Sequence, residues 1–305
     1  METPTSPDSY LKPTTGKLFR ELTVSKQCLL NAHKKKFQKK CYTERMIQEL
    51  FSRIVGNRGI LIDRFVSKQA LDSILRLMRP KISGHELVRI GSDHDGGYLV
   101  PNALQGISAC FSPGVASNCS FELDLAEKGI KCFLADNSVD SPPEYNKNFV
   151  FIKKHLGSFN SSKTITLSDW IHENPTKGDL ILQMDIEGFE YDVISSTSTK
   201  DLERFRIIVL ELHEFDTVVT TLGNIQVMNL LEKLLQNHSI VHIHANNLGS
   251  PRNAYRKKLP RAVELTFLRN DWMLESSFVS KLPHPLDQPN SNEYPEVDIF
   301  KNWFE

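Results

Sequence analysis

The pattern of hydrophobic and polar positions divides the chain into two regions that meet near Pro80. From about residue 17 to residue 80, apolar residues such as Met46, Leu50 and Ile54 recur at helical spacing, and Pro80 ends the pattern. After Pro80, short apolar stretches alternate with amphipathic ones, which is typical of a parallel sheet covered by helices on both faces. We therefore predict a helical arm over residues 17–80 and a doubly wound, mostly parallel α/β domain over residues 81–271.

Individual elements of the α/β domain follow from the same pattern. A polar turn at residues 91–97 separates apolar residues 87–90 from 98–100 and predicts a hairpin. We expect strands at 107–111, 131–135, 149–153, 180–184, 206–212, 240–244 and 262–268. Helices are expected at 118–128 and at 167–172, the second capped by Ser168 or Asp169. A further amphipathic helix is expected to place one set of residues on its buried side: Ile225, Met228, Leu231, Leu234 and Leu235.

The two ends of the chain differ in composition from the domain. Residues 1–16 are rich in Thr, Ser and Pro, lack a signal pattern, and are expected to be disordered. Residues 272–305 are rich in Pro and Asn and are expected to pack on the domain as a tail. No apolar run approaches the roughly 20 residues that a membrane helix needs, and the 5 cysteines lack metal-finger spacing. We expect a soluble, cytoplasmic protein with reduced cysteines.

Charge is balanced over the whole chain but not along it. The 37 basic side chains equal the 37 acidic ones, so nothing global indicates nucleic-acid binding. Residues 1–80 hold 16 Lys and Arg against 7 Asp and Glu, which leaves 21 against 30 in residues 81–305. We interpret the basic arm as a solvated helical face; the alternatives are a patch for an anionic acceptor, a membrane surface or a homodimer contact.

The turn after the first predicted core strand has the features of a cofactor site. Ligands of open α/β sheets lie at the carboxyl ends of the strands. Gly114 allows close approach of the backbone to a ligand, and Val115, Ser117 and Asn118 follow it in the turn. Asp136 ends the next predicted strand, where its carboxylate can accept hydrogen bonds from both hydroxyls of a ribose. The pattern predicts a nucleoside-containing cofactor, which both NAD and S-adenosylmethionine (AdoMet) satisfy.

The glycine content of this turn favours AdoMet. A dinucleotide fingerprint needs G-x-G-x-x-G, which places a pyrophosphate on a helix N-terminus. Gly114 is the one glycine here, and the bulkier Val115, Asn118 and Phe121 occupy the space of a diphosphate. An NAD-dependent or nucleotide-sugar oxidoreductase on a similar sheet is therefore an alternative rather than the preferred interpretation.

Four segments together resemble the FkbM-like family of AdoMet-dependent methyltransferases. Asp185, Glu187, Gly188 and Glu190 match the family's D-x-E-G-x-E segment at the end of a strand. The resemblance continues through residues 95–98, 111–118 and 208–213 and covers about residues 85–270. It implies a seven-stranded, Rossmann-like methyltransferase sheet and O-methylation of a sugar, a glycan or a similar polar metabolite. It also favours a place beside the cofactor for Gly97 and Tyr98.

Candidate catalytic residues lie at the ends of the fourth and fifth predicted core strands. A buried carboxylate needs a cation, a donor or a metal, so Asp185 is expected to meet the cofactor's sulfonium or ammonium group. Methyl transfer to a hydroxyl requires alignment and can require deprotonation. We predict that His213 is the base, with Asp185 and Glu187 beside it. The competing interpretation of a strand histidine is a hydrogen-bonded core residue.

A divalent metal is a second way to deprotonate the acceptor. Asp185 and His213, with His242 or His244, have suitable ligand chemistry, and we take His242 as the third ligand. A metal-free base is preferred because three ligands from separate strands cannot be aligned from sequence. His244 and Asn246 are expected to contact the acceptor. A non-catalytic AdoMet-binding module, with the basic arm recruiting a partner, is the remaining alternative; the retained Asp136, Asp185 and Glu187 argue against it.

Overall fold

The computed structural model describes residues 63–116 and 118–305, and Asp63–Glu305 form one compact unit. The predicted disordered tail, the arm up to residue 62 and the predicted cofactor contact of Ser117 lie outside the described residues. Residues 63–80, which the sequence pattern assigned to the arm, are part of the compact unit.

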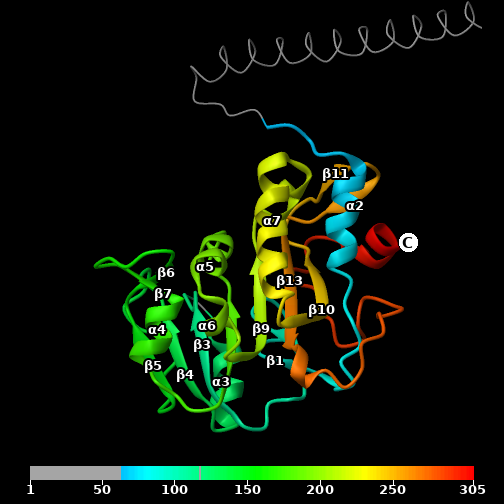
Figure 1. Cartoon of the computed structure of the whole chain (residues 1–305). Coiled ribbons are helices and arrows are strands. Elements are labelled where there is room, and N and C mark those ends of the chain that lie inside the picture. Colours follow the sequence, from blue (N-terminus) through cyan, green and yellow to red (C-terminus); the bar gives the residue numbers. More distant parts are fainter. Residues whose placement is uncertain (1–62, 117) are drawn as a thin grey trace, which may run out of the picture. The chain divides into compact units, whose positions relative to one another are not determined.

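A seven-stranded sheet forms the centre of this unit, with the order β10-β13-β9-β8-β3-β4-β5 (Figure 1). Its strands are β3 (Ile107–Pro113), β4 (Lys131–Ala135), β5 (Phe149–Ile152), β8 (Asp179–Met184), β9 (Phe205–Leu212), β10 (His238–Asn246) and β13 (Ala262–Arg269). Only β13 runs antiparallel to its neighbours, β9 and β10. The prediction of a doubly wound, mostly parallel seven-stranded sheet is confirmed.

The strand order reverses between β3 and β8. From β3 the chain adds β4 and β5 on one side, and it then returns to add β8 and β9 on the other side of β3. Crevices for ligands form where neighbouring strands of a sheet continue in opposite directions. The turns that follow β3 and β8 are therefore the expected position of a site.

The sheet is covered on both faces, and each face has its own apolar core. One core contains residues of α2 (Lys68–Leu77), α4 (Leu167–Glu173), α5 (Glu190–Ser196) and α7 (Thr221–Leu234). The other contains residues of α3 (Ser120–Glu127) and of the predicted hairpin, which is confirmed as β1 (Leu87–Ile90) and β2 (Tyr98–Pro101). Every residue of β9 is buried, in keeping with its mainly apolar sequence, and the charged Arg206 and Glu211 are buried with it.

Several short elements complete the fold. They are β6 (His155–Gly157), β7 (Thr164–Thr166), α6 (Thr199–Leu202), β11 (Arg252–Ala254), β12 (Lys257–Leu259), the 3-10 helices Phe215–Val219 and Asn270–Trp272, and a π-helix at Phe300–Phe304. Within the described residues, no helix is both long and apolar enough to cross a bilayer.

Two local predictions were wrong. The cap of α4 is Thr166, whose hydroxyl accepts the Asp169 N–H at 3.2 Å, while the hydroxyl of Ser168 donates to Asp201. On α7, Ile225 is 51% exposed, because the buried side is centred on Val227, Leu230, Leu231 and Leu234. Close packing of Gly223 against the carbonyl of Thr217 sets this rotation, since a Cβ at Gly223 would lie 2.2 Å from that oxygen.

The C-terminal residues pack on the compact unit through an aromatic contact. Trp303 is 3% exposed, and its ring centroid lies 5.5 Å from that of Phe215, in the 3-10 helix that follows β9. Its indole N–H donates to the carbonyl of Lys258 at 2.9 Å. The tail therefore joins the segment after β9 to the β11–β12 hairpin.

We predict that Trp303→Ala lowers the free energy of unfolding by about 3–5 kcal/mol, because it removes a large buried side chain and one buried hydrogen bond. Urea unfolding measures this change. Tyr145→Ala is the control, since the Tyr145 side chain is 91% exposed, and we expect a change within about 0.5 kcal/mol for it. Equal stability of the two variants would contradict the packed position of the tail.

Candidate cofactor and acceptor site

A cavity of about 590 Å³ lies at the carboxyl ends of β3, β4 and β8. The turn after β3 lines it with Gly114, Val115, Ala116 and Asn118, and the end of β4 lines it with Asp136. The remaining walls come from the hairpin residues 95–98, from residues 155–159 around β6, and from residues 185–192 after β8. This volume lies within the range of about 300–1,000 Å³ that is usual for cofactor sites.

Gly114 joins the two turns that form the floor of this cavity. Its φ is +92°, and a Cβ at this position would lie 1.8 Å from the carbonyl oxygen of Asp185. Its N–H donates to the carbonyl of Ala135 at 3.0 Å. Only glycine readily adopts this left-handed conformation and also leaves room for the Asp185 carbonyl oxygen. Gly114 therefore holds the turn after β3 against the first residue after β8.

Asp136 is held in one orientation beside the cavity. Its side chain belongs to a residue that is 5% exposed, and its Oδ1 accepts bonds from the N–H and hydroxyl of Ser138 at 2.7 and 2.6 Å. Among the described residues, no donor binds Oδ2. The second oxygen is thus available to a ligand that carries hydroxyl groups.

The Asp95–Tyr98 segment contributes to the cavity in two different ways. Asp95, Gly96 and Tyr98 line it, and the Asn118 amide donates to the carbonyl of Asp95 at 2.9 Å. Gly97 is not among the lining residues; a Cβ there would lie 1.9 Å from the carbonyl of Ser92, so its role in this structure is to close the turn.

The segment after β8 is organised around the carboxylate of Glu190, which is fully buried. Glu190 accepts the N–H groups of Ile186 at 2.9 Å and Gly188 at 3.0 Å, and its Oε1 lies 3.1 Å from Nδ1 of His213. Glu187 and Gly188 both have positive φ, 56° and 103°. This reversal of the chain makes the two backbone N–H groups converge on Glu190.

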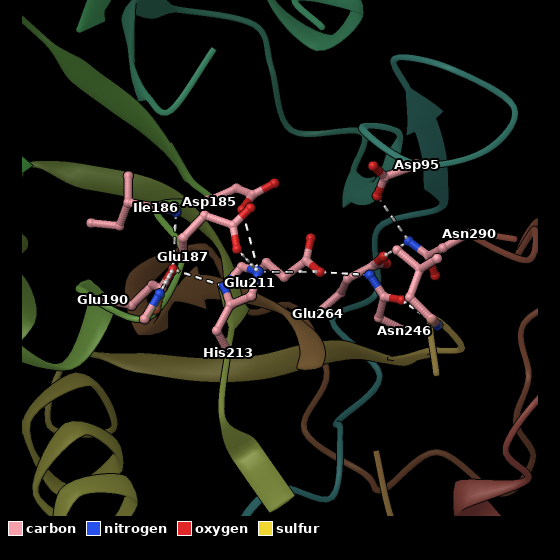
Figure 2. A network of polar contacts seen from close by, with 12 residues as sticks. Asp95, Asp185, Ile186, Glu187, Glu190, Glu211, His213, Asn246, Glu264 and Asn290 are labelled. Atoms are coloured by element: carbon pink, nitrogen blue, oxygen red, sulfur yellow. Dashed lines mark hydrogen bonds and ion pairs between the residues drawn. The ribbon is translucent and has the colours of Figure 1, made fainter. Parts of the chain in front are cut away.

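His213 lies at the centre of a group of carboxylates (Figure 2). Its Nε2 is 3.7 Å from Asp185 Oδ1, 3.5 Å from Glu187 Oε2 and 4.0 Å from Glu211 Oε1. The structure therefore brings the three predicted catalytic residues together. Burial opposes the charged ring, but the hydrogen bond to Glu190 and the surrounding carboxylates outweigh it and raise the pKa of His213 to about 9.

Burial acts in the other direction on the neighbouring acids. It raises the pKa of Asp185 to about 7. The positive charge of His213 opposes this increase, and the negative charges of Asp95 and Glu187 add to it. Burial also raises the pKa of Glu211 well above its ordinary value. Both shifts favour the protonated acids, and a cationic ligand beside them would lower these pKa values and favour the ionised carboxylates.

The two predicted acceptor contacts extend this network away from His213. The Asn246 amide donates to Glu211 Oε1 at 2.6 Å, and His244 Nδ1 lies 3.1 Å from Glu264 Oε2. Asn290 from the C-terminal tail donates to Glu264 at 2.6 Å and reaches Asp95 at 3.4 Å. Figure 2 shows Glu211, Asn246, Glu264 and Asn290 between His213 and Asp95.

The structure does not bring His242 into the predicted metal set. Its Nε2 lies 2.9 Å from Asp287 Oδ1, on the tail. Within the described chain, Asp185, Glu190 and His213 are the residues whose ligand atoms lie within 4.8 Å of one another. Both oxygens of Glu190 already accept backbone or imidazole N–H bonds, so this arrangement fits a hydrogen-bonded histidine better than a metal centre.

Several lining residues were not predicted from the sequence. Glu122 and Gln183 line the cavity and both contact the hydroxyl of Ser112, and Phe159 lines it with its side chain 66% exposed. Phe159 follows β6, which lies outside the seven-stranded sheet, so the strand-end pattern did not identify it. Glu190 was identified only through its match to the D-x-E-G-x-E segment and not as the partner of His213.

Comparison with known proteins agrees with the geometry. Residues 135–236 match the family model described as "Methyltransferase FkbM domain", which covers Asp136, the D-x-E-G-x-E segment and His213. No curated protein matches the chain. A solved precorrin-6y C5,15-methyltransferase from Geobacter metallireducens GS-15 is 10% identical, covers 69% of this chain and 94% of its own, and has a TM-score of 0.30, too low to bear on the function. The family match confirms the predicted resemblance over residues 135–236.

We predict that Glu122→Gln removes a pH-dependent loss of stability. Burial raises the pKa of Glu122 to about 7, so folding favours its protonated form, and the native protein should lose stability as pH rises from about 4.5 through 7. This shift corresponds to about 3 kcal/mol above pH 8. Urea unfolding of both proteins at pH 5.5 and 8.5 measures it: the variant should be relatively more stable at pH 8.5. An identical pH dependence of the two proteins would show that Glu122 ionises normally.

Proposed function

We propose that this methyltransferase uses AdoMet and methylates a hydroxyl of a sugar, a glycan or a similar polar metabolite. The observation that carries the choice of cofactor is the charge of the 590 Å³ cavity. Six acidic residues line it, and no Lys or Arg does among the described residues. The six acidic residues are Asp95, Glu122, Asp136, Asp185, Glu187 and Asp192.

This charge favours AdoMet over a dinucleotide. AdoMet carries a sulfonium and an ammonium group, which carboxylates stabilise, whereas a diphosphate would enter a cavity that offers it no Lys or Arg side chain among the described residues. Asp136 would hold the ribose through its free Oδ2, and Asp185 would face a cationic group of the cofactor. The acidic lining of the cavity and the single glycine of the turn therefore both disfavour the alternative of an NAD-dependent or nucleotide-sugar oxidoreductase.

His213 is the residue we propose as general base. The hydrogen bond from Nδ1 to Glu190 fixes the ring and leaves Nε2 directed toward Asp185 and Glu187 at the cavity. Bound AdoMet supplies an electrophilic methyl group on sulfur. As the acceptor oxygen forms its bond to this methyl carbon and the carbon–sulfur bond breaks, His213 Nε2 takes the hydroxyl proton.

The protonation of His213 is compatible with this role once a cationic cofactor is bound. Without ligand, the carboxylates hold the pKa of His213 at about 9, which favours the imidazolium form. A sulfonium cation beside Asp185 offsets part of that negative field and lowers the pKa of the ring, because like charges disfavour each other. Cofactor binding thus returns His213 toward the neutral form that accepts a proton.

The predicted acceptor contacts belong to the same proposal. Asn246 and His244 are buried, at 4% and 6% exposed, and neither lines the 590 Å³ cavity, so their contact with a hydroxyl-bearing acceptor stays a prediction from the sequence. A cytoplasmic location stays a prediction from the sequence. A homodimer through residues 17–80 stays a prediction from the sequence.

We predict that Asp136→Ala weakens AdoMet binding about 10- to 100-fold, because it removes charged hydrogen bonds to the ribose. Isothermal titration calorimetry measures the dissociation constant, and parallel titrations with NAD test the alternative cofactor. Asp140→Ala is the matched control, since the Asp140 carboxylate is 91% exposed. Unchanged affinity in Asp136→Ala, or preferential binding of NAD, would contradict the proposed cofactor site.

We predict that His213→Ala lowers kcat by about 10²- to 10⁴-fold while changing the affinity for AdoMet much less. Glu190→Gln should give a smaller loss, because the amide can keep the ring in place but does not stabilise its charge. Turnover is measured as AdoMet consumption in a screen of polar acceptors, with product mass identifying the methylated compound. His172→Ala, on an exposed histidine that pairs with Asp201, is the control.

Three results would separate the base from the competing interpretations. Full activity of His213→Ala would remove this residue from the mechanism. Loss of wild-type activity with a chelator, restored by a divalent cation, would favour a metal at Asp185, Glu190 and His213 instead. Binding of AdoMet without turnover on any acceptor, in wild-type protein, would favour the non-catalytic module.

A further inference from the structure

A second cavity lies at the opposite edge of the sheet from the cofactor cavity. Its volume is about 520 Å³, and its walls come from the last turn of α2, the segment 79–81, the start of β10 and residues 270–278. Because β13 is antiparallel to both β9 and β10, the first residues of β10 lie at the edge where β9 begins. The two cavities share no lining residue.

The charge of the second cavity is opposite to that of the first. Arg76, Arg79 and Lys81 line it, and none of its described lining residues is Asp or Glu. None of these three cations forms an ion pair with a described carboxylate; Lys81 Nζ reaches only the hydroxyl of Ser239 at 3.4 Å, and Arg79 donates to the carbonyl of Val279 at 3.1 Å. Residues 81–305 contain more acidic than basic side chains. The lack of carboxylates among the described lining residues of this cavity therefore differs from the composition of the domain around it.

Structural roles account for only part of this arrangement. Arg76 lies in the last turn of α2, where the helix dipole favours one cation. The Arg79 guanidinium lies 5.4 Å from the ring centroid of Phe278 and 5.6 Å from that of Phe300, which holds it in place. Neither role involves Lys81, and neither removes the repulsion among three cations around one cavity.

The other lining groups match a phosphate group with an apolar attachment. Ser276 supplies a hydroxyl and Asn270 an amide N–H beside the cations, while the Ser239 hydroxyl donates to Asn270 Oδ1 at 2.8 Å. Burial lowers the pKa of His238, so this lining histidine adds no charge. The rest of the lining is mainly apolar, and the rim carries exposed apolar side chains: Leu77 is 45% exposed and Phe278 is 54% exposed. Leu274, next to the lining residue Met273, is 73% exposed.

We propose that this cavity binds a phosphate group, with Arg76 and Lys81 as its direct cationic contacts and the apolar rim receiving the attached part of the ligand. The phosphate can belong to the headgroup of an anionic phospholipid or to a soluble phosphate ester. Exposed apolar side chains around a group of cations suit the surface of a bilayer. This site is independent of the proposed methyl transfer, because it lies at the other edge of the sheet.

The test compares the full-length chain with a variant that carries Arg76→Gln and Lys81→Gln. The matched control carries Lys128→Gln and Lys200→Gln, which removes the same charge from exposed positions outside both cavities. Inorganic phosphate is titrated at constant ionic strength by calorimetry. Co-sedimentation with phosphatidylglycerol vesicles is compared with phosphatidylcholine vesicles. Circular dichroism and the Tm without phosphate establish that each variant is folded.

We expect wild type and control to bind phosphate at millimolar or lower concentration, and the Arg76/Lys81 variant to bind at least tenfold more weakly. Vesicle binding that requires phosphatidylglycerol and is lost in the same variant would identify a lipid headgroup; phosphate binding without vesicle binding would identify a soluble ester. The proposal is overturned if wild type binds neither probe, or if the variant binds both as wild type does. Lys81→Gln alone, with the same comparison, replaces the double variant if that protein does not fold.

Discussion

The approach of Gly114 to the carbonyl of Asp185 is the contact on which the rest of the proposed cofactor site depends. It joins the turn after β3 to the turn after β8 across the point where the strand order reverses. The cavity is the space above this contact, and its depth is set by the absence of a side chain at Gly114. A methyl group there would lie 1.8 Å from the Asp185 oxygen and would separate the turns. The acidic wall and the floor of the cavity therefore share one backbone constraint.

Glu190 extends that constraint to the catalytic side chains. A fully buried carboxylate is costly unless its oxygens are satisfied, and here the N–H groups of Ile186 and Gly188 and the His213 ring satisfy them. The same contacts define the backbone that carries Asp185 and Glu187 and the direction of the imidazole. These contacts give a physical reason for the spacing of the D-x-E-G-x-E segment. Its last carboxylate, Glu190, binds the backbone of the turn that carries its first two carboxylates, Asp185 and Glu187.

The sequence was sufficient for the sheet and for the residues next to strand ends. Apolar runs identified the seven strands of the sheet, and Asp136, Asp185 and His213 could be placed because parallel strands end at one edge. Positions that depend on tertiary packing could not be read in this way. The rotation of α7 follows from the contact of Gly223 with Thr217, and the partner of His242 is Asp287, a tail residue 45 positions away for which no periodic pattern exists. The hydrogen bonds of Glu190 to the backbone of this turn likewise require the positive φ values of Glu187 and Gly188.

The distribution of charge explains how one chain can hold an acidic cavity and a basic one. Ser239 lines the basic cavity and Asn246 lies in the acidic network, and both belong to β10. Seven residues of extended strand separate them by roughly 23 Å, a distance at which two unit charges interact by only about 0.7 kcal/mol at an effective dielectric constant of about 20. The three cations therefore do not neutralise the field around Asp185 and His213, and those carboxylates do not weaken an anion at the other edge. Two local fields of opposite sign thus lie at opposite edges of one sheet, and each faces a cavity of its own.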